Sequence, residues 1–178
     1  MKRRRRGETE EQKARRELIS ELLSAANIQS MDDIQALFKE TIAEFMQGSL
    51  EAELDEELGY EPYDVKNKNT ENSRNGHIKK TLRTSMGKIE IDVPRDRNGE
   101  FEPRILPKNQ TSISQDMEEK IFCVYAKGMS VSDIEEPILD IYGLEISDTT
   151  VSRITDKILP AAKAFFRRKI VWHHQKSH

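Results

Sequence analysis

The spacing of apolar residues changes twice along this chain of 178 residues, and no other feature constrains the fold as strongly. Apolar residues recur every three or four positions in 31–58, at every second position in 82–93, and every three or four positions again after 116. The first spacing lines one face of a helix, and the second lines one face of a strand. The sequence therefore predicts a mainly α fold with a small antiparallel β-meander.

The longest apolar stripe lies in residues 31–58. Ser30 and Asp33 resemble a capping box with Asp in place of Glu, and Gly59 suits the end of a helix. The stripe consists of Ile34, Leu37, Phe38, Ile42, Phe45, Met46, Leu50, Leu54 and Leu58. Such a stripe needs an apolar partner. The core of the same chain would supply one, and so would a second copy in a dimer.

The period-two pattern predicts the meander in residues 80–106. The alternating residues are Leu82, Thr84 and Met86, followed by Ile89, Ile91 and Val93. Pro94 is expected to stop this strand. Asn98-Gly99 is typical of a two-residue hairpin turn, so 101–106 is expected to supply a third strand.

Residues 111–160 predict three short helices. Their expected boundaries are Gly128 and Gly143 as ends, Ser130 with Asp133 as a second capping box, Ser147 as the third cap and Pro160 as the final stop. Pro137 falls inside the second helix, where proline costs roughly 3 kcal/mol. That helix is expected to kink at Pro137 or to begin close to it.

The formal net charge of −3 conceals strong segregation. The net charges are +5 in residues 1–16, −11 in 17–63, +4 in 64–110, −6 in 111–160 and +5 in 161–178. Such blocks indicate separate modules, although a charge run is also typical of a solvated face. The expected modules are a basic, partly disordered segment (1–30), a helical region (31–62), a loop with the meander (63–110), a helix-turn-helix-like unit (111–160) and a basic tail (161–178).

The sequence excludes several classes of protein. No apolar run approaches the ~20 residues that span a bilayer. The basic N-terminus lacks the apolar stretch of a signal peptide, so a cytoplasmic, nucleoid-associated protein is expected. The single cysteine, Cys123, excludes an intramolecular disulfide framework.

The last predicted helix carries the first set of candidate DNA contacts. Val151, Ile154 and Ile158 are expected to face inward, in the pattern of a helix-turn-helix. The outward candidates are Ser147, Thr149, Thr150, Ser152, Arg153 and Lys157. Hydroxyls at a helix N-terminus can approach phosphates, and arginine can bind guanine through two hydrogen bonds. The alternative is a plain three-helix bundle with a polar face.

The meander carries the second set of candidate DNA contacts. These residues are Arg74, Lys79, Lys80, Arg83, Lys88, Arg95 and Arg97. A two-stranded ribbon fits a major groove, and its cations can neutralise phosphates. Alternatively, lysines on exposed strands protect the edges of a sheet from aggregation.

The sequence assigns no catalytic or metal-binding residue. It contains no phosphate-binding glycine loop, no zinc-protease helix and no nucleophile elbow. Glu53 and Glu57 stand four positions apart and could be imagined as a metal pair in a nuclease. Acidic residues at this spacing on a surface helix are far more often a solvated face, so no metal is expected in this chain.

Six short blocks occur in order between residues 32 and 160. They are Glu53–Tyr60, Arg74–Gly76, Val93–Arg97 with Phe101–Pro103, Tyr125–Ser130 with Asp133-Ile134, Tyr142-Gly143 with Ser147, and Val151–Lys157. Together they resemble the N-terminal part of the mutator-type bacterial insertion-sequence transposases. The resemblance implies binding to double-stranded DNA at the terminal inverted repeats of the element. It also implies a following ribonuclease-H-like domain, whose Asp-Asp-Glu triad holds two divalent metal ions such as Mg²⁺.

The end of the chain departs from that family pattern. No acidic residue follows Asp156, and residues 165–178 contain three of the four histidines and the only tryptophan. We therefore expect an out-of-frame tail and a transposase fragment without its catalytic domain or cofactor. Its expected partners are DNA and either a second copy or a full-length transposase. The alternatives are a protein-interaction (dimerisation) module and an inhibitor of transposition.

Overall fold

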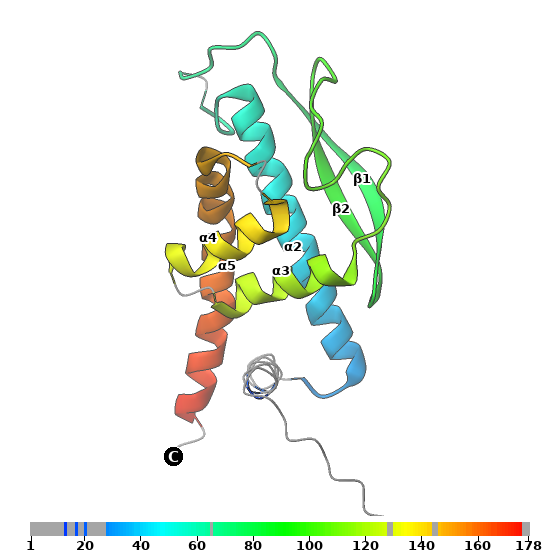
Figure 1. The fold of residues 1–178 in the computed structure, drawn as a ribbon, viewed down its shortest axis with the longest axis vertical. Coiled ribbons are helices and arrows are strands. Elements are labelled where there is room, and N and C mark those ends of the chain that lie inside the picture. Colours follow the sequence, from blue (N-terminus) through cyan, green and yellow to red (C-terminus); the bar gives the residue numbers. More distant parts are fainter. Residues whose placement is uncertain are drawn as a thin grey trace, which may run out of the picture.

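A computed structural model describes residues 28–64, 66–127, 130–143 and 146–175, together with Lys13, Glu17 and Ser20. The elements are α2 (Met31–Leu58), β1 (Arg74–Thr84), β2 (Gly87–Asp96), α3 (Gln115–Lys127), α4 (Val131–Tyr142) and α5 (Asp148–Gln175). Figure 1 shows α2 running between the β1–β2 hairpin and α5, with α3 and α4 crossing in front. The described part is therefore mainly helical with one small antiparallel sheet, as the periodicity predicts.

Helix α2 begins and ends where the sequence predicts. The Ser30 hydroxyl accepts a hydrogen bond from the Asp33 N–H (3.1 Å), and the Asp33 carboxylate accepts one from the Ser30 N–H (2.9 Å). Gly59 has a φ of 73°, a left-handed conformation that suits glycine, and its N–H donates to the Asp55 carbonyl. The capping box and the glycine stop are both confirmed.

The stripe of α2 finds its partner inside the same chain. Ile42, Phe45, Met46 and Leu50 are fully buried and belong to one core. Both strands, the segment between β2 and α3, and helices α3, α4 and α5 also contribute to this core, for example through Leu82, Ile91, Ile121, Ile138 and Ile154. Core packing therefore accounts for the stripe, and the apolar face offers no argument for a dimer.

The sheet has two strands, so the predicted third strand is wrong. The hairpin turns at Ser85 and Met86, with Thr84 opposite Gly87. Residues 101–106 form no strand because side chains capture their backbone N–H groups: Asp96 binds that of Phe101, and Glu53 binds that of Ile105. The Asn98-Gly99 turn consequently closes no second hairpin.

The edges of the hairpin also differ from expectation. Pro94 does not stop the second strand; it lies within β2 opposite His77, beside an irregularity in the pairing of β1. On the outer edge of β1, Arg83 exchanges backbone hydrogen bonds with the segment 111–113 (2.9 Å each). That isolated bridge covers part of the outer edge of β1, the edge that does not face β2.

The caps of the C-terminal helices are partly as predicted. Gly143, with a φ of 74°, ends α4, and the Ser147 hydroxyl accepts the Thr150 N–H (3.2 Å) at the start of α5. The second capping box is wrong: the Ser130 hydroxyl donates to the Asp133 carboxylate instead of capping the backbone. The predicted end at Gly128 lies outside the described residues.

Both prolines lie inside helices. Helix α4 begins at Val131, six positions before Pro137, so the predicted late start is wrong. Helix α5 continues through Pro160 to Gln175, so the predicted stop is wrong as well. Proline removes one helical hydrogen bond. Ile158 and Ala162, on either side of Pro160, are buried in the core, and this packing offsets the loss.

Helix α5 therefore crosses the module boundary expected at residue 160. The out-of-frame origin of the tail stays a prediction. Among the helices of the described residues, none combines the length and apolar composition that crossing a bilayer requires.

Candidate nucleic-acid interface

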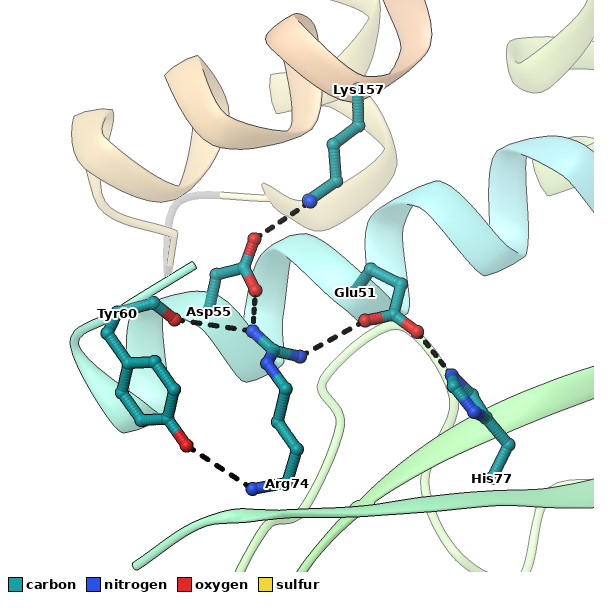
Figure 2. A network of polar contacts seen from close by, with 6 residues as sticks. All are labelled: Glu51, Asp55, Tyr60, Arg74, His77 and Lys157. Atoms are coloured by element: carbon teal, nitrogen blue, oxygen red, sulfur yellow. Dashed lines mark hydrogen bonds and ion pairs between the residues drawn. The ribbon is translucent and has the colours of Figure 1, made fainter. Parts of the chain in front are cut away.

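Two of the predicted DNA-binding cations, Arg74 and Lys157, meet at one buried carboxylate (Figure 2). Asp55 of α2 is 1% exposed. Its Oδ1 accepts from Arg74 Nη2 of β1, and its Oδ2 lies 2.8 Å from Lys157 Nζ of α5. Asp55 therefore joins three elements, and both cations serve the fold.

Further contacts surround this pair. Arg74 Nη1 lies 3.2 Å from Glu51 Oε2, and its Nη2 donates to the Tyr60 carbonyl (3.3 Å). His77 Nε2 lies 2.6 Å from Glu51 Oε1. Burial lowers the pKa of Arg74 from its ordinary value, and the Glu51 carboxylate acts in the opposite direction. We call Glu51, Asp55, Tyr60, Arg74, His77 and Lys157 the Asp55 network.

The local sequence explains why this network forms. Glu51 and Asp55 stand four positions apart and share one face of α2. Gly76, with a φ of 66°, lies in the irregular stretch between Arg74 and His77. This stretch brings both side chains to the same two carboxylates. The sequence block that contains Asp55 and the block that contains Arg74 are thus joined by an ion pair in the folded protein.

Glu53 is a second buried carboxylate that links separate segments, rather than a surface residue. It is 7% exposed, and its carboxylate accepts from the N–H groups of Arg104 and Ile105 and from the Tyr142 hydroxyl (2.7 Å). Burial, reinforced by Glu53, raises the pKa of Tyr142 well above its ordinary value. Glu57 is exposed, so the two residues do not face one site. Within the described part of the chain, no group of three or more His, Cys, Asp or Glu residues could hold a metal ion.

The start of α5 presents only part of its predicted contact set. Thr150 is 2% exposed, so its expected outward position is wrong. Ser147 is exposed, but its hydroxyl donates to Glu56 (2.9 Å). Thr149 and Ser152 are exposed. Arg153 is half-buried and forms no ion pair with a described residue, and its Nε is buried without a hydrogen-bond partner there.

Two lysines of the hairpin are engaged within the molecule. Lys79 Nζ lies 2.7 Å from Glu90 Oε1, and the pKa of Lys79 is raised by that hydrogen bond. Lys80 Nζ donates to the carbonyls of Pro107 (3.3 Å) and Lys108 (2.9 Å). Burial lowers the pKa of Lys80.

The remaining four predicted cations are exposed: Arg83, Lys88, Arg95 and Arg97. We call them the hairpin cations. Within the described residues, their side chains form no ion pair or hydrogen bond. Arg83 and Lys88 stand directly opposite one another in the strand pairing, next to the turn. Like charges in that position destabilise a sheet unless an anion lies close by.

Sequence reasoning missed the buried carboxylates. Asp55 lies within an acidic run, Glu53–Glu57, that is typical of a solvated face, yet Asp55 and Glu53 are buried. The apolar stripe was a usable signal for this burial. Leu54 belongs to the stripe, and Glu53 and Asp55 are its direct neighbours in the helix, so they lie beside the core as well. Sequence reasoning also missed Tyr63, which is fully exposed and has a φ of 68°.

Comparison with known proteins agrees with the sequence blocks. Residues 13–173 match the family described as "Transposase, Mutator family". The chain is 38% identical over 141 residues to the transposase for insertion sequence element IS1201 of Lactobacillus helveticus, covering 79% of this chain and 38% of the relative.

Two further relatives are covered to a similar extent. A probable transposase for an ISRM3-like element of Sinorhizobium fredii is 33% identical over 155 residues, covering 87% of this chain and 38% of the relative. The transposase for IS905 of Lactococcus lactis is 34% identical over 138 residues, covering 78% and 35%. The chain thus spans little more than a third of the length of the curated relatives it matches.

Proposed function

The chain belongs to the Mutator family of transposases, and from this premise we propose that it binds double-stranded DNA at the terminal inverted repeats of an insertion sequence. The observation that carries the proposal is the set of hairpin cations, which are exposed and without counter-charges among the described residues. Phosphates of a duplex would supply the missing charge. Edge protection alone does not require four cations to remain unpaired.

The positions of these cations suit a duplex. Arg83 and Lys88 flank the turn, whereas Arg95 and Arg97 lie at and just beyond the other end of β2. The seven residue-to-residue steps from Lys88 to Arg95 span roughly 23 Å at about 3.3 Å per step. That length corresponds to about seven base pairs at ~3.4 Å each. The hairpin would therefore contact phosphates at two places on one site.

The start of α5 would add a second, helix-turn-helix-like contact. Five residues separate α4 from α5, and Ser147 caps α5. In this proposal Thr149, Ser152 and Arg153 approach the bases or the backbone. Lys157, which is bound to Asp55, instead holds α5 in place. A helix N-terminus also favours the negative charge of a phosphate.

The proposal places strand cleavage outside this chain. Cleavage by two metal ions needs paired carboxylates. In the proposal, these belong to the part of the family's length that the chain does not span. A protein that occupied element ends through this region, alone or paired with a second copy, would compete with a full-length transposase for the same DNA. It would be found with the nucleoid.

Fluorescence anisotropy with a labelled duplex of the element end tests the proposal. Arg83→Ala with Lys88→Ala should weaken binding at least tenfold, because two phosphate contacts are lost. Lys79→Ala is the matched control: it removes an exposed hairpin cation that is already paired with Glu90, so binding should change little. Equal affinities of the parent and the double variant would refute the proposal.

A further inference from the structure

A cavity of about 370 Å³ lies beside the Asp55 network, and the proposed duplex contacts do not use it. It opens where α2, the loop after α2, the first residues of β1, β2 and α5 meet. Its volume falls within the roughly 300–1,000 Å³ of typical ligand sites. The lining residues that matter here are Tyr63, Arg74, His77, Pro94, Lys157 and Glu51.

Tyr63 is the unusual residue of this lining. Its side chain is fully exposed, and its φ of 68° is a left-handed conformation that bulky side chains rarely adopt. Within the described residues, it forms no hydrogen bond. A strained backbone that holds an aromatic ring in water stabilises nothing in the free protein. Such outliers are typical of sites where the residue contacts a ligand.

The wall beside Tyr63 carries mostly hydrogen-bond donors. Lys157 is 29% exposed, Arg74 is 21% exposed and His77 is 49% exposed. Glu51 is the acid that faces the same space, at 26% exposed, because Asp55 is buried beneath the cations. Figure 2 shows Lys157, Arg74 and His77 converging on these two carboxylates. In addition, Arg74 Nε is buried without a hydrogen-bond partner in the described part.

We propose that this cavity binds one unpaired nucleotide of DNA, with the base stacked on Tyr63 and the phosphate beside Lys157 and His77. An aromatic face and nearby cations are the two groups that recognise single-stranded nucleic acid without reading its sequence. A base inside a duplex is covered on both faces, so the interior of a duplex offers Tyr63 no base to stack on. The inference rests on the proposed DNA binding and adds a preference for a single strand next to the duplex.

The test compares a blunt duplex with the same duplex carrying three unpaired nucleotides at the 3′ or the 5′ end. With one polarity, the extension should tighten binding to the full chain about tenfold, because stacking one base on an aromatic side chain contributes a factor of roughly 5 to 150. Tyr63→Ala should remove this gain, whereas Tyr63→Trp should keep it. All variants should bind the blunt duplex equally. Leu139→Ala, at a second exposed apolar residue, is the control.

A spectroscopic readout reports the stacking itself. With 2-aminopurine as the first unpaired base, the parent should quench its fluorescence, and Tyr63→Ala should not. If duplex binding persists but the extension adds nothing, or Tyr63→Ala retains the gain, the inference is wrong and the proposed function stands. If neither DNA binds, both are wrong. Free dAMP that competes fully with the extension would assign the cavity to a free nucleotide and overturn the inference.

Discussion

At the scale of single residues, buried carboxylates decide how the elements join. Asp55 receives cations from β1 and α5, and Glu53 receives N–H and O–H donors from the segment after β2 and from α4. A buried charge is costly unless it is paired and hydrogen-bonded. These partners keep both carboxylates stable inside the molecule. They also explain why Arg74 and Lys157 are poorly suited to grip the backbone of a duplex along the hairpin.

Replacing Asp55 should destabilise the protein more than any exposed acid would. Asp55→Ala leaves two partly buried cations without their carboxylate, and breaking such a pair costs about 3 kcal/mol. Glu57→Ala, at an exposed position of the same helix, should change the free energy of unfolding by less than about 0.5 kcal/mol. Urea unfolding followed by circular dichroism measures both. Equal values would mean that the Asp55 network contributes little.

Asp96 predicts a dependence of stability on pH. Its burial raises the pKa, but hydrogen bonds from Asn72 Nδ2 and from the N–H groups of Glu100 and Phe101 outweigh burial, so the pKa lies below its ordinary value. The carboxylate is therefore favoured in the folded state. Its contribution is complete above the unfolded pKa of about 3.9 and is lost as the pH falls through the lower folded pKa.

Unfolding free energies of the parent and Asp96→Asn, measured between pH 6 and pH 3, test this dependence. The advantage of the parent should be constant near pH 6 and should shrink below about pH 4. An advantage that stayed the same at pH 3 would contradict the assignment.

At the scale of the elements, close packing of α2 against α5 depends on one glycine. A Cβ built on Gly48 would lie 2.6 Å from Ile158 Cδ1. Ile158 is itself 1% exposed, so its side chain has little room to move. Gly48 thus allows the two helices to approach within the core. Glycine inside a helix is otherwise unfavourable.

Gly48→Ala should therefore destabilise the protein, although alanine favours helices by about 1 kcal/mol. Overpacking costs about 1–3 kcal/mol and should outweigh that gain. Adding Ile158→Val removes the clashing methyl group and should restore part of the loss. A double-mutant cycle by thermal unfolding measures this coupling. Additive effects would show that the two residues do not interact.

At the scale of the whole molecule, charge and burial separate two kinds of cation. Arg74 and Lys157 are bound to acidic residues of α2, whereas the cations at the ends of the hairpin remain available. The small net charge of the chain does not reveal this difference. Binding to DNA is governed by the phosphate contacts a surface makes rather than by the net charge.

The salt dependence of the DNA-binding constant should report how many phosphates the protein contacts. If the four hairpin cations neutralise four phosphates, the logarithm of the binding constant should fall with the logarithm of salt concentration with a slope of about −3.6. Arg95→Ala with Arg97→Ala should reduce the magnitude of the slope by about 1.8. Anisotropy titrations between low and moderate salt measure it. An unchanged slope would place the contacts elsewhere.

Local patterns predicted local structure well. The stripe of α2, its capping box, the Gly59 and Gly143 ends and the alternation of Ile89 and Ile91 depend on neighbours within a few positions. The second capping box failed through the local contact between Ser130 and Asp133. The third strand and the stop at Pro160 failed where distant parts of the chain intervened. The third strand was lost because Asp96 and Glu53 bind the N–H groups after β2, and α5 passes Pro160 because the core holds Ile158 and Ala162.

The candidate site divides in the same way. The residue types alone showed that this chain has many cations and hydroxyl groups that could contact DNA. The ordered sequence blocks alone indicated its family. Only the tertiary structure decided which of them are available: Thr150 is buried, and Arg74 and Lys157 are bound to Asp55, whereas Arg83 and Lys88 stay exposed. The reason is physical, because the availability of a charge depends on solvent and on partners brought together by folding, which sequence spacing does not specify.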